Sequence, residues 1–141
     1  MASANLDLVR SIYAAWGRGD YSSAEWAHPE MEWVMADGPA PGSWTGMAGA
    51  AEGLRGFLSA WEDFRTVVDE FRELDNARVL VLVHYSGRGK ASGLKLEQMQ
   101  AKGAHVIHLH GGQVTRVVRY FDRERALADL GLAPEAGSQG L

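Results

Sequence analysis

Four extended, β-type segments follow one another from Arg65 almost to the end of the chain, and they restrict the possible folds more than any other feature. They read "RTVVDEFREL", "ARVLVLVHYSGRG", "LKLEQMQAKGAHVIHL" and "QVTRVVRYF", with turn residues between them. The first half of the chain is instead mainly helical in its periodicity. Runs of helices followed by runs of strands predict an α+β fold, in which helices pack on one face of a curved, mainly antiparallel sheet.

Helical spacing of apolar residues predicts a first helix in "NLDLVRSIYAAWG" and another in "MAGAAEGLRGFLSAWEDF". The apolar stripe of the latter consists of Leu54, Phe57, Leu58 and Trp61. A last short helix, "DRERALADLGL", has Asp122 as a possible N-cap. Ser22 or Ser23 could also begin a short helix that must end before Pro29, so we expect three to four helices.

Size and composition limit the classes of protein that the chain can belong to. A chain of 141 residues that is 46% hydrophobic and 23% charged predicts one globular domain over residues 1–132 and a flexible tail over 133–141. A net charge of −4 opposes binding to nucleic acid or to an anionic membrane surface. The absence of cysteine excludes disulfides and thiolate chemistry. Without a membrane-length apolar run or a signal-peptide pattern, we expect a cytoplasmic protein.

The segment "MEWVMAD" alternates with the period of a strand, which places Asp37 on the face of Met31, Trp33 and Met35. Asp37 therefore ends an apolar face beside a Gly/Pro loop. A carboxylate there is partly desolvated, which raises its pKa and suits it to act as a general base. Alternatively, Asp37 caps the turn at "DGP", as aspartate often does.

Three of the five histidines fall within "AHVIHLHGG". Strand alternation places His105 on the face of Ile107 and Leu109, and places His108 and His110 on the other face. His105 is then the strongly polar side chain of an otherwise apolar face. His108 and His110 could ligate a metal ion, but no third ligand is evident on their face, so we expect no metal site.

The turn after these histidines decides which arginine joins His105. A three-residue loop ending at Gly112 would pair His105 with Val117 and bring Arg119 to its face. A two-residue Gly-Gly loop would bring Arg116 instead. The three-residue loop is preferred because it places a glycine in the left-handed conformation that glycine adopts most easily.

Three stretches together resemble a known family: "IYAAWGRGD", "HPEMEWVMADGPAPGSWTG" and "HLHGGQVTRVVRYFDRERALADLGL". From about Asn5 to Leu132 the chain is similar to SnoaL-like members of the NTF2-like superfamily, which includes ketosteroid isomerase. The resemblance implies a cone-shaped fold, in which a strongly curved sheet is wrapped by helices around one deep apolar pocket. It also implies a homodimer that forms through the outer face of the sheet.

The same resemblance suggests roles for individual residues. The base of ketosteroid isomerase corresponds to Asp37, and its oxyanion-hole acid corresponds to His105 if one residue is removed from the following turn. The position of the oxyanion tyrosine is occupied by Ile12, with Tyr13 next to it, which departs from a steroid isomerase. Dehydratase members use paired histidines with an aspartate, which His84 could supply together with His105 and Asp37. The Asp and Arg of the related epoxide hydrolases are missing from "VLVLVHYSG", so that activity is less expected.

The leading hypothesis is a cofactor-free acid/base enzyme, an isomerase, cyclase or dehydratase, that acts on a small apolar carbonyl compound. Asp37 would remove a proton, and His105 with Tyr13 or Arg119 would steady the oxyanion. The residues expected to line an apolar or aromatic ligand are Tyr13, Trp16, Trp33, Phe57, Trp61, His84, Met99 and Arg119. The alternative is a non-catalytic module for binding a hydrophobic ligand or for dimerisation.

Overall fold

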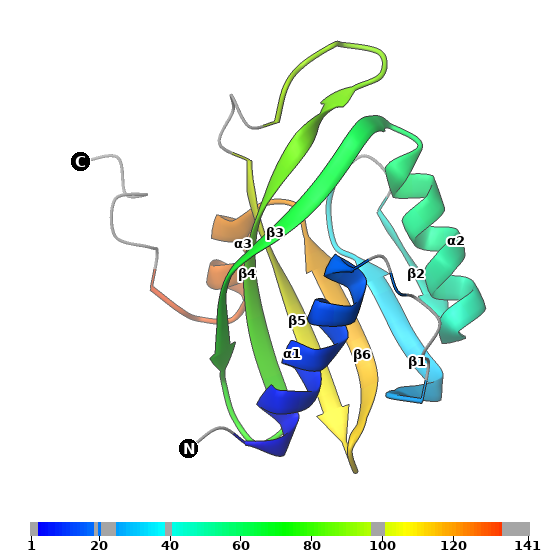
Figure 1. The fold of residues 1–141 in the computed structure, drawn as a ribbon. Helices are drawn as coiled ribbons and strands as arrows, with labels where there is room; N and C mark the ends of the chain where they lie inside the picture. Colours follow the sequence, from blue (N-terminus) through cyan, green and yellow to red (C-terminus); the bar gives the residue numbers. More distant parts are fainter. Residues whose placement is uncertain (1–2, 19, 21–24, 39–40, 97–100, 134–141) are drawn as a thin grey trace.

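A six-stranded sheet forms the body of the protein in the computed structural model, which describes residues 3–18, 20, 25–38, 41–96 and 101–133 (Figure 1). Its elements are α1 (Ala4–Gly17), β1 (Ala27–Met35), β2 (Gly42–Thr45), α2 (Gly46–Leu58), β3 (Trp61–Glu73), β4 (Arg78–Gly89), β5 (Lys102–His110), β6 (Gln113–Tyr120) and α3 (Arg123–Asp129). The strand order is β2-β1-β6-β5-β4-β3. The β1–β6 pair is parallel and the other pairs are antiparallel, so the predicted α+β class with a mainly antiparallel sheet is confirmed.

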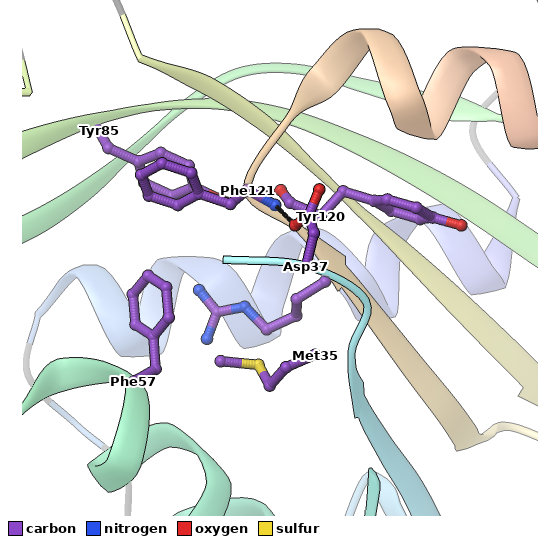
Figure 2. A pocket seen from close by; sticks show the side chains of 7 residues that line it. Met35, Asp37, Phe57, Tyr85, Tyr120 and Phe121 are labelled. Atoms are coloured by element: carbon purple, nitrogen blue, oxygen red, sulfur yellow. Dashed lines mark hydrogen bonds between the residues drawn. The ribbon is translucent and has the colours of Figure 1, made fainter. Parts of the chain in front are cut away.

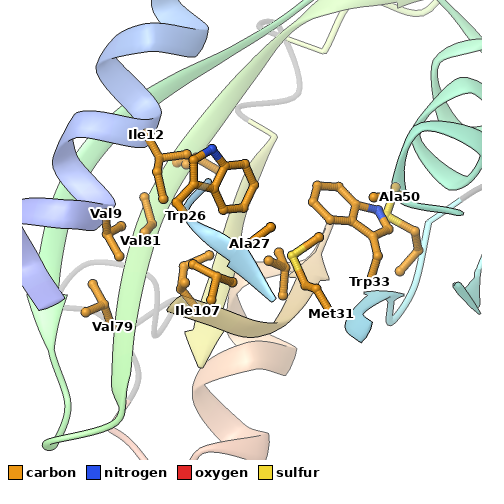
Figure 3. Close-up of a cluster of buried hydrophobic side chains, with 14 of the residues drawn as sticks. Val9, Ile12, Trp26, Ala27, Met31, Trp33, Ala50, Val79, Val81 and Ile107 are labelled. Carbon is orange, nitrogen blue, oxygen red and sulfur yellow. The ribbon is translucent and has the colours of Figure 1, made fainter. Parts of the chain in front are cut away.

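One face of the sheet, the inner face, packs against α1 and α2 around the main hydrophobic core. Val9 and Ile12 of α1 lie over Val79, Val81 and Ile107, as Figure 3 shows. The core continues toward α2 through Met31, Trp33, Ala50 and Phe57. Met31, Trp33 and Met35 are all buried in this core, which confirms the alternation read from "MEWVMAD".

The helix α3 packs on the opposite, outer face, and it lies behind the strands in Figure 1. Its Ala126 and Leu127 join a second core with Leu80, Leu82 and Val106. The prediction that helices cover one face only is therefore wrong for α3. The physical reason is that Val79 to Val83 are all buried, so the middle strands present apolar side chains on both faces and need a cover on each. The homodimer contact stays a prediction, and α3 covers part of the face on which it was placed.

The helix α2 is shorter than predicted and buries a different stripe. It ends at Leu58, which is 38% exposed, and Trp61 begins β3. Its buried residues are Ala50, Gly53 and Phe57. Gly53 lets the helix lie against Trp44, since a Cβ at Gly53 would come within 2.7 Å of that ring. Because this buried stripe includes a glycine and an alanine, the spacing of large apolar side chains does not predict it.

Three other boundaries differ from the predictions or fall outside the described residues. Glu25 and Trp26 form a turn and β1 begins at Ala27, so no helix leads up to Pro29 in the described residues, while Ser22 and Ser23 lie outside them. Of the predicted strand over residues 97–110, residues 97–100 lie outside the described residues, and β5 begins at Lys102. The predicted tail lies outside the described residues beyond Ala133.

The β5–β6 hairpin has a tight turn followed by a bulge. Gly111 and Gly112 both have positive φ, 58° and 79°, and His110 pairs with Gln113, so the preferred three-residue loop is wrong. The register then shifts between His108 and Leu109, which leaves an extra residue in β6. The bulge reverses the alternation, and His105 pairs with Arg119. Arg119 thus shares the face of His105 as expected, but the bulge in β6 causes this and not a three-residue loop.

Arg123, in the first turn of α3, anchors that helix to the sheet. Its side chain is 5% exposed, and its Nε donates to the Gly103 carbonyl at 3.1 Å. One terminal nitrogen donates to Asp69 Oδ2 at 2.8 Å and also to the Val83 carbonyl. None of the helices in the described part of the chain combines the length and apolar character needed to cross a bilayer.

Replacing this arginine should strongly destabilise the fold. We expect Arg123→Met to lower the free energy of unfolding by about 2–4 kcal/mol, because it removes the hydrogen bonds of the arginine to Asp69 Oδ2 and to two carbonyl oxygens. Urea denaturation measures the change. Arg125→Met, at an exposed position of the same helix, is the control and should cost no more than about 0.5 kcal/mol. Equal losses in the two variants would contradict the anchoring role.

Candidate functional site

A small cavity lies on the inner side of the sheet where β1, β4 and β6 meet α2 (Figure 2). Its volume of about 10 Å³ is room for about one water molecule. The lining residues are Met35, Asp37, Phe57, Tyr85, Arg119, Tyr120 and Phe121. The cavity therefore joins one carboxylate and one guanidinium to a mostly apolar and aromatic wall.

Asp37 follows β1 and is held by the segment that precedes α3. Its Oδ1 accepts a hydrogen bond from the Phe121 amide at 2.5 Å, and its Oδ2 accepts one from the Asp122 amide at 3.3 Å. Asp37 thus binds backbone amides more than 80 positions away in the chain. Each carboxylate oxygen carries two lone pairs, so a carboxylate with one such bond per oxygen can still accept a proton.

Arg119 lies in β6 directly opposite His105. Its Nε donates to His105 Nε2 at 3.2 Å, and its guanidinium carbon lies 5.4 Å from the centre of the Trp33 ring. Among the described residues no carboxylate forms an ion pair with Arg119, and this includes Asp37 in the same cavity. The positive charge of Arg119 is therefore not neutralised by a neighbouring side chain of the described chain.

His105 lies behind Arg119 and is not among the residues that line the cavity. The side chain is 2% exposed and contacts Tyr13, whose hydroxyl oxygen is 2.5 Å from His105 Nδ1. Burial, and then the charge of Arg119, lower the pKa of His105 well below its ordinary value, so the imidazole is neutral. Burial likewise raises the pKa of Tyr13. Tyr13, although one residue away from the position implied by the resemblance, reaches His105.

Stacked aromatic rings form one wall of the cavity. The Phe121 ring stacks on Tyr85, with centroids 5.2 Å apart and planes inclined by 5°. Trp61, which is not among the residues that line the cavity, stacks on Phe121 with centroids 5.7 Å apart and planes inclined by 13°. Burial raises the pKa of Tyr85 to about 12. Gly103 makes this arrangement possible, because a Cβ there would collide with the Tyr85 hydroxyl.

Tyr85 is one of four lining residues that sequence reasoning missed, together with Met35, Tyr120 and Phe121. The signal for it was present, since Tyr85 has the same alternation in β4 as Val81 and Val83, which face the inner core. Figure 2 shows Phe57 and Met35 on the side of the cavity opposite Tyr85 and Phe121. These four side chains come from three different secondary-structure elements and the segment after β6, and only the fold brings them together.

The remaining predicted ligand residues fall into three groups. Phe57 lines the cavity, whereas Trp33 is buried beside Arg119 and Trp16 packs edge-on against Trp26 at 5.8 Å, and neither tryptophan lines the cavity. Met99 lies outside the described residues. The prediction that His84 lines the ligand is wrong. His84 is exposed on the outer face, where its Nδ1 is 2.7 Å from Asp69 Oδ1. The reason is strand alternation, since the adjacent Val83 and Tyr85 both face inward.

The two outward histidines and Arg116 also lie away from the cavity. Arg116 pairs with Glu32 at 2.9 Å and is opposite His108 in the hairpin. Burial, followed by the charge of Arg116, lowers the pKa of His108, while His110 is exposed. Within the described ranges, no three His, Asp or Glu side chains gather in a way that could hold a metal ion.

Comparisons with known proteins place the chain in a family. The model of the SnoaL-like domain matches residues 9–117. No protein of curated function matches the sequence. An NTF2-like protein of unknown function from Burkholderia pseudomallei has 23% sequence identity and a TM-score of 0.71, over 90% of this chain and 97% of that one.

Two further solved structures contain small ligands. TerC, co-crystallised with polyporic acid, has 25% identity and a TM-score of 0.68, over 91% of this chain and 98% of its own. A protein with a ketosteroid isomerase-like fold from Catenulispora acidiphila, in complex with trimethylamine, has 16% identity and a TM-score of 0.59, over 89% and 93% of the two chains. Since the family model covers most of the sequence and the solved structures share the fold, the chain belongs to the SnoaL-like domain family and has an NTF2-like fold.

Proposed function

We propose that the protein binds a small apolar carbonyl compound in the cavity and moves a proton at the carbon next to its carbonyl group, without a cofactor. One observation carries this proposal: Asp37 and Arg119 line the same aromatic cavity but do not form an ion pair. A base and a cation that are kept apart in an apolar space are what enolate formation requires. The small ligands in the structures of TerC and the Catenulispora protein support a small-molecule pocket.

Asp37 is the base in this proposal. It takes a proton from the carbon, and the electron pair of the broken C–H bond forms the enolate, whose charge lies on the carbonyl oxygen. Arg119 stabilises that oxygen by charge and by hydrogen bonding, which is stronger in a site that excludes water. Asp37 then returns the proton to the same carbon or to another one. The second outcome is an isomerisation and needs no other reactant.

His105 is the positioning residue of the site. Arginine only donates hydrogen bonds, so His105 Nε2 must be the acceptor of the bond from Arg119. The neutral ring then carries its single hydrogen on Nδ1 and donates it to the Tyr13 hydroxyl oxygen. A neutral acceptor orients Arg119 and leaves its charge available for the ligand.

A second candidate function, binding without catalysis, is favoured by the hydrogen bonds of Asp37. Both carboxylate oxygens accept hydrogen bonds from backbone amides, which gives Asp37 a structural role. The cavity of about 10 Å³ is also smaller than an aromatic ring, so either function requires lining side chains such as Phe57 to move when a ligand enters. The following experiment separates the two candidates.

Asp37→Asn should strongly slow proton exchange while largely preserving the fold. We expect the wild-type protein to accelerate deuterium incorporation from D₂O at the carbon next to the carbonyl of 2-tetralone, and the variant to be slower by about 10²–10⁴-fold. Proton NMR measures the exchange. Asparagine keeps one acceptor oxygen for the Phe121 amide, and thermal unfolding shows whether the fold is retained.

Asp7→Asn, at an exposed position of α1, is the matched control and should exchange at the wild-type rate. A folded Asp37→Asn variant with the wild-type rate would contradict the role of Asp37 as the base. A wild-type protein no faster than buffer would overturn the catalytic proposal and leave binding alone.

The neutral state of His105 predicts how stability depends on pH. The unfolded chain protonates this histidine below its ordinary pKa of 6.5, whereas the folded chain resists protonation, so its contribution to stability is present above pH 6.5 and is lost as the pH falls. Between about pH 7.5 and 5.5, wild type should lose more stability than His105→Gln, by on the order of 1 kcal/mol. Urea denaturation at the two pH values measures the difference, and His110→Gln is the exposed control. Equal losses in wild type and His105→Gln would show that His105 is not kept neutral.

A further inference from the structure

We propose that the ligand of this cavity is an aromatic acid, with a planar ring beside the aromatic wall and a carboxylate paired with Arg119. The inference rests on the proposed function, because it concerns the same cavity, and it adds the chemical class of the ligand. It depends on the charge of Arg119, on the donors that Arg119 has left, and on the ring geometry around it.

Two arginines packed against the sheet, Arg123 and Arg119, differ in how their charges are neutralised. Arg123 is 5% exposed and is neutralised by the carboxylate of Asp69 at 2.8 Å. Arg119 is also partly buried, but its bonded partner is the neutral ring of His105, and within the described residues no carboxylate pairs with it. Placing a guanidinium in an apolar site without a counter-ion is costly. An anionic ligand would remove that cost, and a neutral one would not.

The remaining donors of Arg119 suit a carboxylate. Its Nε is taken by His105, and the Tyr85 hydroxyl is a further hydrogen-bonding neighbour. The other N–H groups of the guanidinium remain free of these two contacts. They lie in one plane and can bind two carboxylate oxygens side by side. Asp37 does not take them in this structure, since its oxygens accept hydrogen bonds from the Phe121 and Asp122 amides and it forms no ion pair with Arg119.

The wall of the cavity suits a flat ring. Trp61, Phe121 and Tyr85 form a stack of nearly parallel rings, and Phe57 meets this stack with its ring centre 6.0 Å from that of Phe121. Aromatic rings gain stabilisation beyond burial when they pack face to face with an offset or edge to face. Displacement of the Phe57 side chain would therefore open a space beside the Phe121 and Tyr85 rings and next to the Arg119 cation.

This ligand class is compatible with the proposed chemistry. A carboxylate next to a carbonyl group lets one guanidinium contact an oxygen of each. The contact with the carboxylate is present throughout and contributes to binding, whereas the contact with the carbonyl oxygen strengthens as the enolate forms and contributes to rate.

Isothermal titration calorimetry with 2-naphthoate and its neutral counterpart 2-naphthamide tests the inference. We expect wild type to bind 2-naphthoate at least about tenfold more tightly, since a paired charge in an apolar site contributes that much or more. Arg119→Met should remove the preference, and Arg119→Lys should restore part of it, because lysine keeps the charge but not the fork. Arg116→Met, three positions earlier in β6 and exposed beside Glu32, should keep the wild-type preference.

Equal binding of the two probes by wild type would overturn the inference, as would a full preference retained by Arg119→Met. Failure of the proposed function can be distinguished from failure of the inference about the ligand class. Asp37→Asn should still bind 2-naphthoate, so binding that depends on Arg119 in a protein that exchanges no protons would support the ligand class and refute the catalytic role. Proton exchange on 2-tetralone without binding of 2-naphthoate would refute the ligand class alone.

Discussion

The pairing of His105 with Arg119 across the β5–β6 hairpin is the contact on which the candidate site depends. It exists because a tight Gly111-Gly112 turn is followed by a one-residue bulge in β6. In a strand, a shift of one residue moves every side chain to the other face. Without the bulge, Arg119 would point outward and Arg116, now paired with Glu32 on the surface, would lie inside. A change of one residue in register thus decides which of the two arginines lies inside, next to His105.

The sheet is covered on both faces, and each face has a buried or partly buried arginine with a different task. On the outer face, Arg123 binds Asp69 and two carbonyl oxygens, and it holds α3 against β4 and β5. On the inner face, Arg119 is oriented by a neutral histidine and shares a cavity with Asp37. Arg123, whose charge is neutralised, has a structural role, whereas Arg119, whose charge is not neutralised, is available to a ligand.

Membership of the SnoaL-like domain family defines the architecture and leaves the chemistry to the side chains, because one fold supports many reactions. Here the polar groups of the site form a connected set. Tyr13 contacts His105, His105 orients Arg119, and Arg119 faces the cavity that Asp37 also lines. The three stacked rings beside them supply the apolar surface. The proposed acid/base chemistry on an aromatic ligand accounts for all of these features.

Local alternation in the sequence was enough to predict the class of the fold, the first helix, the inward face of Met31, Trp33 and Met35, and the isolation of His105 from the other two histidines of its strand. These properties depend on neighbours within a few residues. The tertiary structure alone decided the parallel β1–β6 pair, the position of α3 on the outer face and the binding of Asp37 to the Phe121 amide. Each of these depends on register between segments far apart in the chain, and no pattern within a single segment encodes it.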